Sequence, residues 1–210
     1  MGKLKNGLLG CFYGKIGPVV GYRRFNQNIV RSLPCVVAPS KSAKRKAQQR
    51  RFAKASMFCS VAYPLLKKGF IPKDLCVSSF HRAFSLNYPF FKYDGDRVEV
   101  AYSKITISKG ELKPLVHFKA FVDRDVLSIR WRFYRCDLCG EQRVQLLVFD
   151  EKHFCGRCFT DLALASDFEA KVKIGSKMSC SRLHLYLFYI DPNGKGEQAI
   201  SGTSYALLEC

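Results

Sequence analysis

Two pairs of cysteines in the second half of the chain have the spacing of a structural zinc site. Cys136 and Cys139 form one Cys-x-x-Cys pair, and Cys155 and Cys158 form the other. Structural Zn²⁺ takes four thiolate or imidazole ligands in a tetrahedron, and a tight turn aims both sulfurs of a pair at one ion. The chain opens without a secretory signal, so we expect its ten cysteines to stay reduced. The spacing therefore predicts one structural Zn²⁺ held by these four side chains.

Closure of that zinc site depends on how the chain runs between the pairs. If residues 143–149 form one straight strand, they span roughly 20 Å at ~3.3 Å per residue, and residues 150–154 must then reverse the chain. His153 in that reversal is a substitute ligand. The segment from Cys155 to Cys158 also has the form of a redox dithiol, but no βαβ pattern surrounds it, so zinc is favoured over redox catalysis.

The second candidate site is a concentration of positive charge. The formal net charge is +18, and sixteen Lys and Arg precede the first acidic residue, Asp74. Charge of one sign in one part of a chain predicts an acidic partner, either nucleic acid or another polyanion, and a solvated basic helix is the alternative. The candidate contacts crowd one short stretch and are Lys44, Arg45, Lys46, Arg50, Arg51 and Lys54.

Helical spacing of apolar residues predicts a helix over residues 40–63, which carries this basic stretch and ends or kinks at Pro64. Before it, strands over residues 16–22 and 28–33 predict a β-hairpin. After it, we expect a second helix over residues 73–86 and a strand over residues 98–107. Cationic side chains in the first turn of a helix oppose the helix dipole, which is consistent with a helix that meets an anion.

From Leu112 onward the pattern changes to period 2. Short alternating segments at this spacing predict an antiparallel, immunoglobulin-like β-sandwich with Trp131 in its core. The whole chain is thus predicted to be mainly β with α, with a basic hairpin-and-helix module over residues 1–110 and the sandwich over residues 111–210. The expected sandwich strands are residues 115–122, 126–134, 143–149, 169–174, 183–190 and 204–208.

Several segments resemble an uncharacterised protein family of Bacteroidota that is known only as a domain of unknown function. The resemblance rests on Met1-Gly-Lys-Leu-Lys-Asn-Gly-Leu-Leu-Gly10, Gly14–Tyr22, Val30–Pro34, Ala47–Ala53, Tyr102–Gly110 and Leu127–Trp131. It implies a bacterial origin and a C-terminal domain similar to fibronectin type III and immunoglobulin folds. It implies no catalytic residue. The many cysteines and the dense basic helix of this chain depart from the family's usual pattern.

Three functions remain open from the sequence. The favoured one is a non-enzymatic protein that binds nucleic acid through its basic N-terminal module. The alternative is a structural or assembly protein of a mobile element or virus-like particle, which self-associates and displays the immunoglobulin-like domain. A redox or zinc enzyme is third, since no hydrolase, kinase or dinucleotide motif is found. We expect no membrane and no small-molecule substrate, and a cytoplasmic or virion-associated location.

Overall fold

The chain has two compact units, and the predicted boundary after residue 110 falls inside the second. The units are Met1–Ser42 with Asp74–Cys76, and Ala43–Lys73 with Val77–Cys210. In the described part of the chain, no helix is both long and apolar enough to cross a membrane. The computed structural model describes residues 3–4, 12–24, 27–35, 42–72, 77–94, 97–123, 125–132, 141–175, 178 and 182–208.

The first unit is an antiparallel sheet in the order β1-β2-β3-β4. The strand predicted over residues 16–22 is confirmed from Val19 onward as part of β3, and it pairs with β4 as the predicted hairpin. Its start is wrong, because Ile16 ends β2, and Gly17, with a φ of 56°, and Pro18 turn the chain between the two strands. The return strand, predicted over residues 28–33, is confirmed as β4. The strands are β1 (Lys3–Leu4), β2 (Phe12–Ile16), β3 (Val19–Arg24) and β4 (Gln27–Ser32).

The second unit begins with α1 (Ala43–Val61), α2 (Tyr63–Gly69) and α3 (Ser79–Asn87). Pro64 lies at the start of α2, where its missing N–H costs nothing, so the expected break at this proline is confirmed. Ser78 caps α3, because its hydroxyl accepts a hydrogen bond from the His81 N–H. This cap explains why α3 begins at Ser79. Residues 73–76, where this helix was predicted to begin, lie outside the described residues.

A short hairpin of β5 (Phe91–Asp94) and β6 (Arg97–Val100) follows the helices. The strand predicted over residues 98–107 is therefore wrong beyond Val100, and a 3₁₀ turn at Tyr102–Lys104 follows. Side chains replace the strand ladder here. The Asn87 amide accepts from the Thr106 N–H and donates to its carbonyl oxygen, both at 2.8 Å.

The rest of the chain forms an antiparallel β-sandwich with sheet orders β11-β8-β7 and β10-β9-β12-β13. Taken along the chain, the first, second and fifth strands form one sheet. The third, fourth, sixth and seventh form the other, which is an immunoglobulin-like arrangement. The predicted fold class is confirmed. The strands are β7 (Val116–Asp123), β8 (Val126–Arg132), β9 (Arg143–Asp150), β10 (Cys155–Phe159), β11 (Glu169–Lys173), β12 (Leu183–Ile190) and β13 (Ser204–Leu208).

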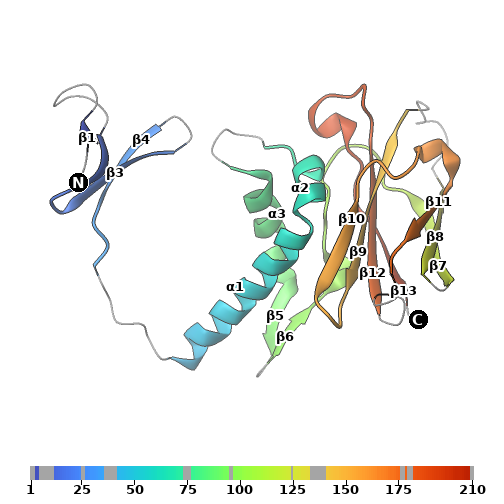
Figure 1. Ribbon diagram of the computed structural model, residues 1–210, viewed down its shortest axis with the longest axis horizontal. Helices are drawn as coiled ribbons and strands as arrows, with labels where there is room; N and C mark the ends of the chain where they lie inside the picture. The colour runs from blue at the N-terminus through green and yellow to red at the C-terminus, as the bar shows by residue number, and fades with distance from the viewer. Residues whose placement is uncertain are drawn as a thin grey trace. The chain divides into compact units, whose positions relative to one another are not determined.

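This unit has three layers, which are the helices, the four-stranded sheet and the three-stranded sheet, and a hydrophobic core lies between each neighbouring pair. The helices cover the outer face of the four-stranded sheet (Figure 1). Along β9, Leu147 and Phe149 belong to the core shared with the helices, whereas Leu146 and Val148 belong to the core between the sheets. Trp131 is 1% exposed in the second core, as predicted. Its indole N–H donates to the Ala165 carbonyl oxygen at 2.9 Å.

Candidate functional site

Helix α1 buries side chains against the body of its unit only in its second half. Ala55, Phe58 and Cys59 are buried there, and the ring centres of Phe58 and Phe149 lie 4.9 Å apart. Over residues 43–54 no side chain is buried. The sequence explains the difference, since residues 43–54 hold Lys, Arg and Gln on every side of the helix and offer no apolar stripe. The basic turns therefore extend beyond the packed layers.

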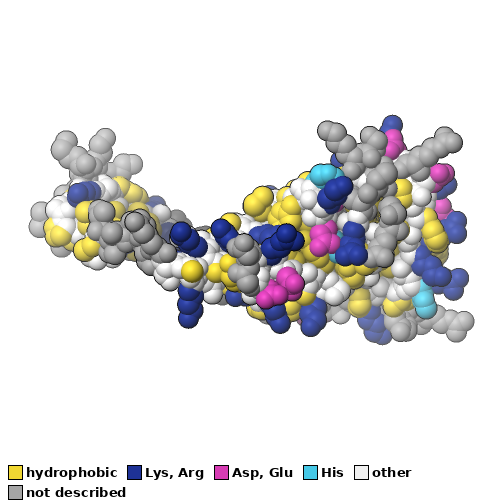
Figure 2. Space-filling model, turned by 90° about the horizontal axis from the view of Figure 1, so that it is seen from below, with side chains coloured by type: hydrophobic (Ala, Val, Ile, Leu, Met, Phe, Trp, Pro, Cys, Tyr) yellow, Lys and Arg dark blue, Asp and Glu magenta, His cyan; other side chains and the backbone are white. Residues whose placement is uncertain are grey.

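The first turn of α1 carries Lys44, Arg45 and Lys46, all exposed, and no acidic residue. Among the residues that the structure describes, no carboxylate pairs with any of these three side chains. Arg50, one turn further on, is also exposed. Dark-blue side chains stand along the stretch that α1 occupies in Figure 2. These four residues combine high local charge with access to solvent, which a polyanion contact requires.

The other two predicted contacts, Arg51 and Lys54, take part in the fold. The Arg51 guanidinium donates to the Tyr88 carbonyl oxygen at 3.0 Å, and its central carbon lies 4.1 Å from the centre of the Tyr88 ring. Lys54 Nζ donates to the Val98 carbonyl oxygen at 2.9 Å and lies 5.2 Å from the Phe154 ring centre. Both side chains are half-buried. These contacts join α1 to the 3₁₀ turn that follows α3, to β6 and to the turn that precedes β10, so the two residues serve to position the helix.

Apolar surface lies beside the basic turns. Phe52 and Met57 are each 56% exposed and line a shallow groove of ≈ 570 Å³ along α1. The Phe52 ring packs against two other rings, since its centre lies 5.0 Å from that of Phe84 and 6.5 Å from that of Tyr88. An exposed ring on the helix that carries the cations is an arrangement that both phosphates and bases can contact.

The described cysteine pair lies on a strand. Cys155 pairs with Asp150 and Cys158 with Leu147 across β10 and β9. Because side chains alternate along a strand, residues three apart face opposite sides of the sheet. Cys155 is exposed, whereas Cys158 is half-buried against the helices and its thiol donates to the Val61 carbonyl oxygen at 3.2 Å. Burial raises the pKa of Cys158 to about 11 and also raises the pKa of Cys155.

This geometry does not fit half of a tetrahedral zinc site. Two thiols on opposite faces of one strand do not converge on an ion. Within the described part of the chain, no three His, Cys, Asp or Glu side chains group as metal ligands. Cys136 and Cys139 lie outside the described residues. The zinc site stays a prediction from spacing, and its four ligands require a different course for β10.

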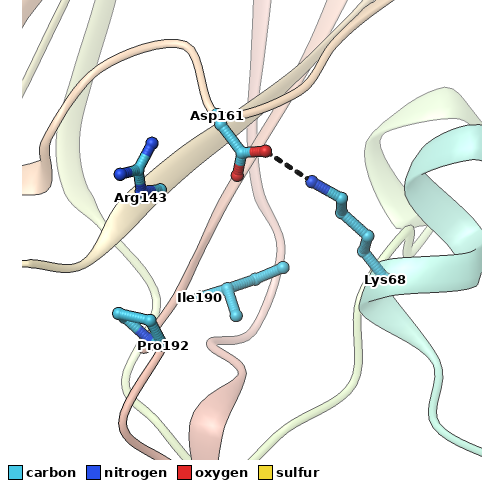
Figure 3. Close-up of a pocket in the computed structure, with 5 residues that line it drawn as sticks. All are labelled: Lys68, Arg143, Asp161, Ile190 and Pro192. Atoms are coloured by element: carbon cyan, nitrogen blue, oxygen red, sulfur yellow. Dashed lines mark hydrogen bonds and ion pairs between the residues drawn. The ribbon is translucent and has the colours of Figure 1, made fainter.

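An ion pair joins the helices to the sandwich at a pocket of ≈ 320 Å³, lined also by Ile190 and Pro192. Figure 3 shows Lys68 of α2 pointing to Asp161, with Arg143 on the other side of the carboxylate. The Lys68 Nζ lies 2.7 Å from Asp161 Oδ2, and the buried Gln145 amide donates to Oδ1 at 2.8 Å. The Lys68 hydrogen bond is the main reason that the Asp161 pKa is lowered. Because both of its carboxylate oxygens are bonded, Asp161 has a structural role and holds α2 to the sandwich.

A buried polar cluster at one end of β9 and β12 was not predicted. The His184 ring stacks on Tyr102 at 3.9 Å between centres, and its Nδ1 lies 2.9 Å from the Tyr205 hydroxyl. Its Nε2 lies 3.3 Å from a carboxylate oxygen of Glu151. Burial lowers the pKa of His184, which keeps the imidazole neutral near neutral pH. The sequence signal for it was a histidine inside an otherwise apolar strand.

A scan of protein-family models finds no family that matches the chain, and a search of curated proteins finds no match. The function is therefore argued from the residues described above.

Proposed function

We propose that this chain is a non-enzymatic nucleic-acid-binding protein, whose primary contact is the basic first half of α1. The observation that carries the proposal is the exposure of Lys44, Arg45, Lys46 and Arg50 on turns where no side chain is buried and no residue is acidic. A duplex or single strand presents a regular row of phosphates, and each Lys or Arg that neutralises one releases a counterion. Arg51 and Lys54 support this surface through their contacts with the body of the unit.

The proposal predicts how steeply the binding constant falls with salt concentration. If all four side chains contact phosphates of duplex DNA, log K falls against log salt with a slope of about −3.6. Raising salt from about 50 to about 200 mM then weakens binding by roughly 150-fold. Small neutral or singly charged ligands show no such slope, so the measurement separates a polyanion contact from other binding.

The experiment is a fluorescence-anisotropy titration of labelled duplex and single-stranded DNA and RNA against the full chain. A variant with Lys44, Arg45, Lys46 and Arg50 changed to Gln should lose most of the salt slope and keep its fold, because exposed charges add little stability. The matched control changes Arg51 and Lys54 to Gln. It should lower the unfolding temperature through the lost carbonyl contacts and leave most of the slope. Equal slopes for wild type and the first variant would refute the assignment.

Self-association is a second candidate, which the first unit favours. One face of its sheet carries apolar side chains in the open, with Ile16 43% and Val30 59% exposed. Burying such side chains against another copy would gain about 1.5–3 kcal/mol each. An assembly protein would show large homo-oligomers in light scattering after nuclease treatment and high salt, whereas a nucleic-acid-binding monomer would not.

A further inference from the structure

The two faces of the sheet in the first unit differ in chemistry. The Phe12 ring covers Gly21, since a Cβ at Gly21 would lie 2.6 Å from it. In the register of the sheet, Gly21 pairs with Val30, so Phe12, Gly21 and Val30 share one face. Ile16 and Val19 also face that side by alternation. This face is apolar over these residues, and Arg23, Asn28 and Ser32 lie at its ends.

The opposite face carries aromatic and cationic side chains around two half-buried apolar residues, Val20 and Ile29. Lys15 pairs with Val20, which puts Tyr13, Lys15 and Tyr22 on the same side by alternation. Arg31 belongs to that side as well, because its guanidinium carbon lies 5.6 Å from the centre of the Tyr22 ring. Tyr13 is 38% exposed, Lys15 and Arg31 are exposed, and Tyr22 is half-buried. Two rings and two cations thus share one pleated surface.

The charge of this unit favours one class of partner. The first acidic residue of the whole chain is Asp74, so β2, β3 and β4 contain no carboxylate that could neutralise Lys15 or Arg31 from within the sheet. A cationic partner is repelled by such a face, and an apolar partner leaves its cations without counter-charges. Single-stranded nucleic acid supplies both phosphates for the cations and unstacked bases for the rings, whereas the bases of a duplex are already stacked on one another.

We propose that the face of the β2-β3-β4 sheet formed by Tyr13, Lys15, Tyr22 and Arg31 binds single-stranded nucleic acid, with bases stacked on the tyrosines and phosphates paired with the cations. The proposal deepens the proposed function by adding a second contact that reads strandedness. Helix α1 then supplies charge without preference, and the sheet supplies the preference for a single strand. Stacking on one aromatic ring contributes roughly 5- to 150-fold in affinity.

The first test uses the full chain and a fluorescein-labelled oligo-dT of about 20 nucleotides, with a duplex of equal length. A variant with Tyr13 and Tyr22 changed to Leu keeps apolar bulk and loses the rings. It should bind oligo-dT at least ~10-fold more weakly and bind the duplex about as well as the wild type. The matched control is Tyr93→Leu, which removes a ring of 37% exposure from β5 of the second unit and should change neither affinity.

The second test needs no variant, so a folding defect cannot obscure it. Oligo-dT that carries 5-iodouracil is photo-crosslinked to the wild-type chain and digested with trypsin. Adducts should map to the peptides of residues 6–15 and 16–23, which contain Tyr13 and Tyr22. Adducts confined to residues after 42, or equal oligo-dT affinity for the double Leu variant and wild type, would overturn the sheet proposal. Loss of the salt slope only in the α1 Gln variant leaves the proposed function standing, while loss of strand preference only in the Leu variant supports the sheet.

Discussion

Phe58→Ala should destabilise the helices and the sandwich together. Phe58 is fully buried on α1, and its ring centre lies 4.9 Å from that of Phe149 on β9 and 6.1 Å from that of Tyr186 on β12. Truncating a buried Phe costs about 3–5 kcal/mol. For a chain of this size, each kcal/mol lowers the unfolding temperature by about 2–4 °C, so we expect a decrease of about 6–20 °C.

Trp131 makes this effect visible far from the mutation. It is the single tryptophan of the chain, and it lies in the core between the two sheets, where no helix residue reaches. Its fluorescence during thermal unfolding therefore reports the sandwich, while far-UV circular dichroism at 222 nm reports mostly the helices. If the layers form one cooperative unit, both signals shift by the same amount in Phe58→Ala.

The control for this experiment is Phe52→Ala, on the same helix with 56% of its surface exposed. It loses mainly the ring contact with Phe84 at 5.0 Å, which is worth about 0.5–1.5 kcal/mol. If residues 1–110 and 111–210 instead fold as separate domains, Phe58→Ala will lower the helical transition and leave the Trp131 transition in place. That result would refute the shared core.

Three further predictions follow from single contacts. Gly110→Ala should destabilise the fold by about 1–3 kcal/mol or more in urea unfolding, because its Cβ would lie 1.9 Å from the Ile200 carbonyl oxygen. In the control Gly202→Ala, the new Cβ meets no atom nearer than 3.6 Å, so this variant should be nearly neutral. Asp161→Asn should lose under ~1 kcal/mol near neutral pH, since the ion pair with Lys68 is partly exposed. The native carboxyl has a lowered pKa, so its contribution is present above the ordinary value of 3.8 and is lost as the pH falls through the lowered pKa, where the gap between variant and wild type in urea unfolding should close. A zinc chelator should leave the unfolding temperature unchanged if β10 keeps its course, and a chelator-dependent decrease with release of zinc would show that its two cysteines converge on a metal.

The sandwich was predictable because one face of most of its strands is polar. Strand β7 alternates half-buried and exposed residues throughout, and β8 buries Leu127, Ile129 and Trp131 on a single parity. The helical layer was harder to assign to the sandwich. Its signal was present in β9 and β12, which read as nearly continuous apolar runs, and such runs indicate strands covered on both faces.

The missed elements lack a local pattern. Strand β10 contains Cys155, Gly156 and Arg157 in a row, and its ladder with β9 is what makes it a strand. For the candidate site, the sequence predicted the basic stretch. It did not show which of its cations bond to the fold and which face solvent. Arg51 and Lys54 bond to carbonyl groups 37 and 44 residues away, and no local pattern shows those contacts.

The first turns of α1, in which no side chain is buried, link nucleic-acid binding to the stability of the helix. An isolated helical segment of this length is marginal in water, and three cations in its first turn oppose the helix dipole. Phosphates that neutralise Lys44, Arg45 and Lys46 remove that repulsion, so nucleic acid should stiffen the turns it contacts. By thermodynamic linkage, substitutions that raise helix content there, such as exposed Gln49→Ala, should tighten binding without adding a contact.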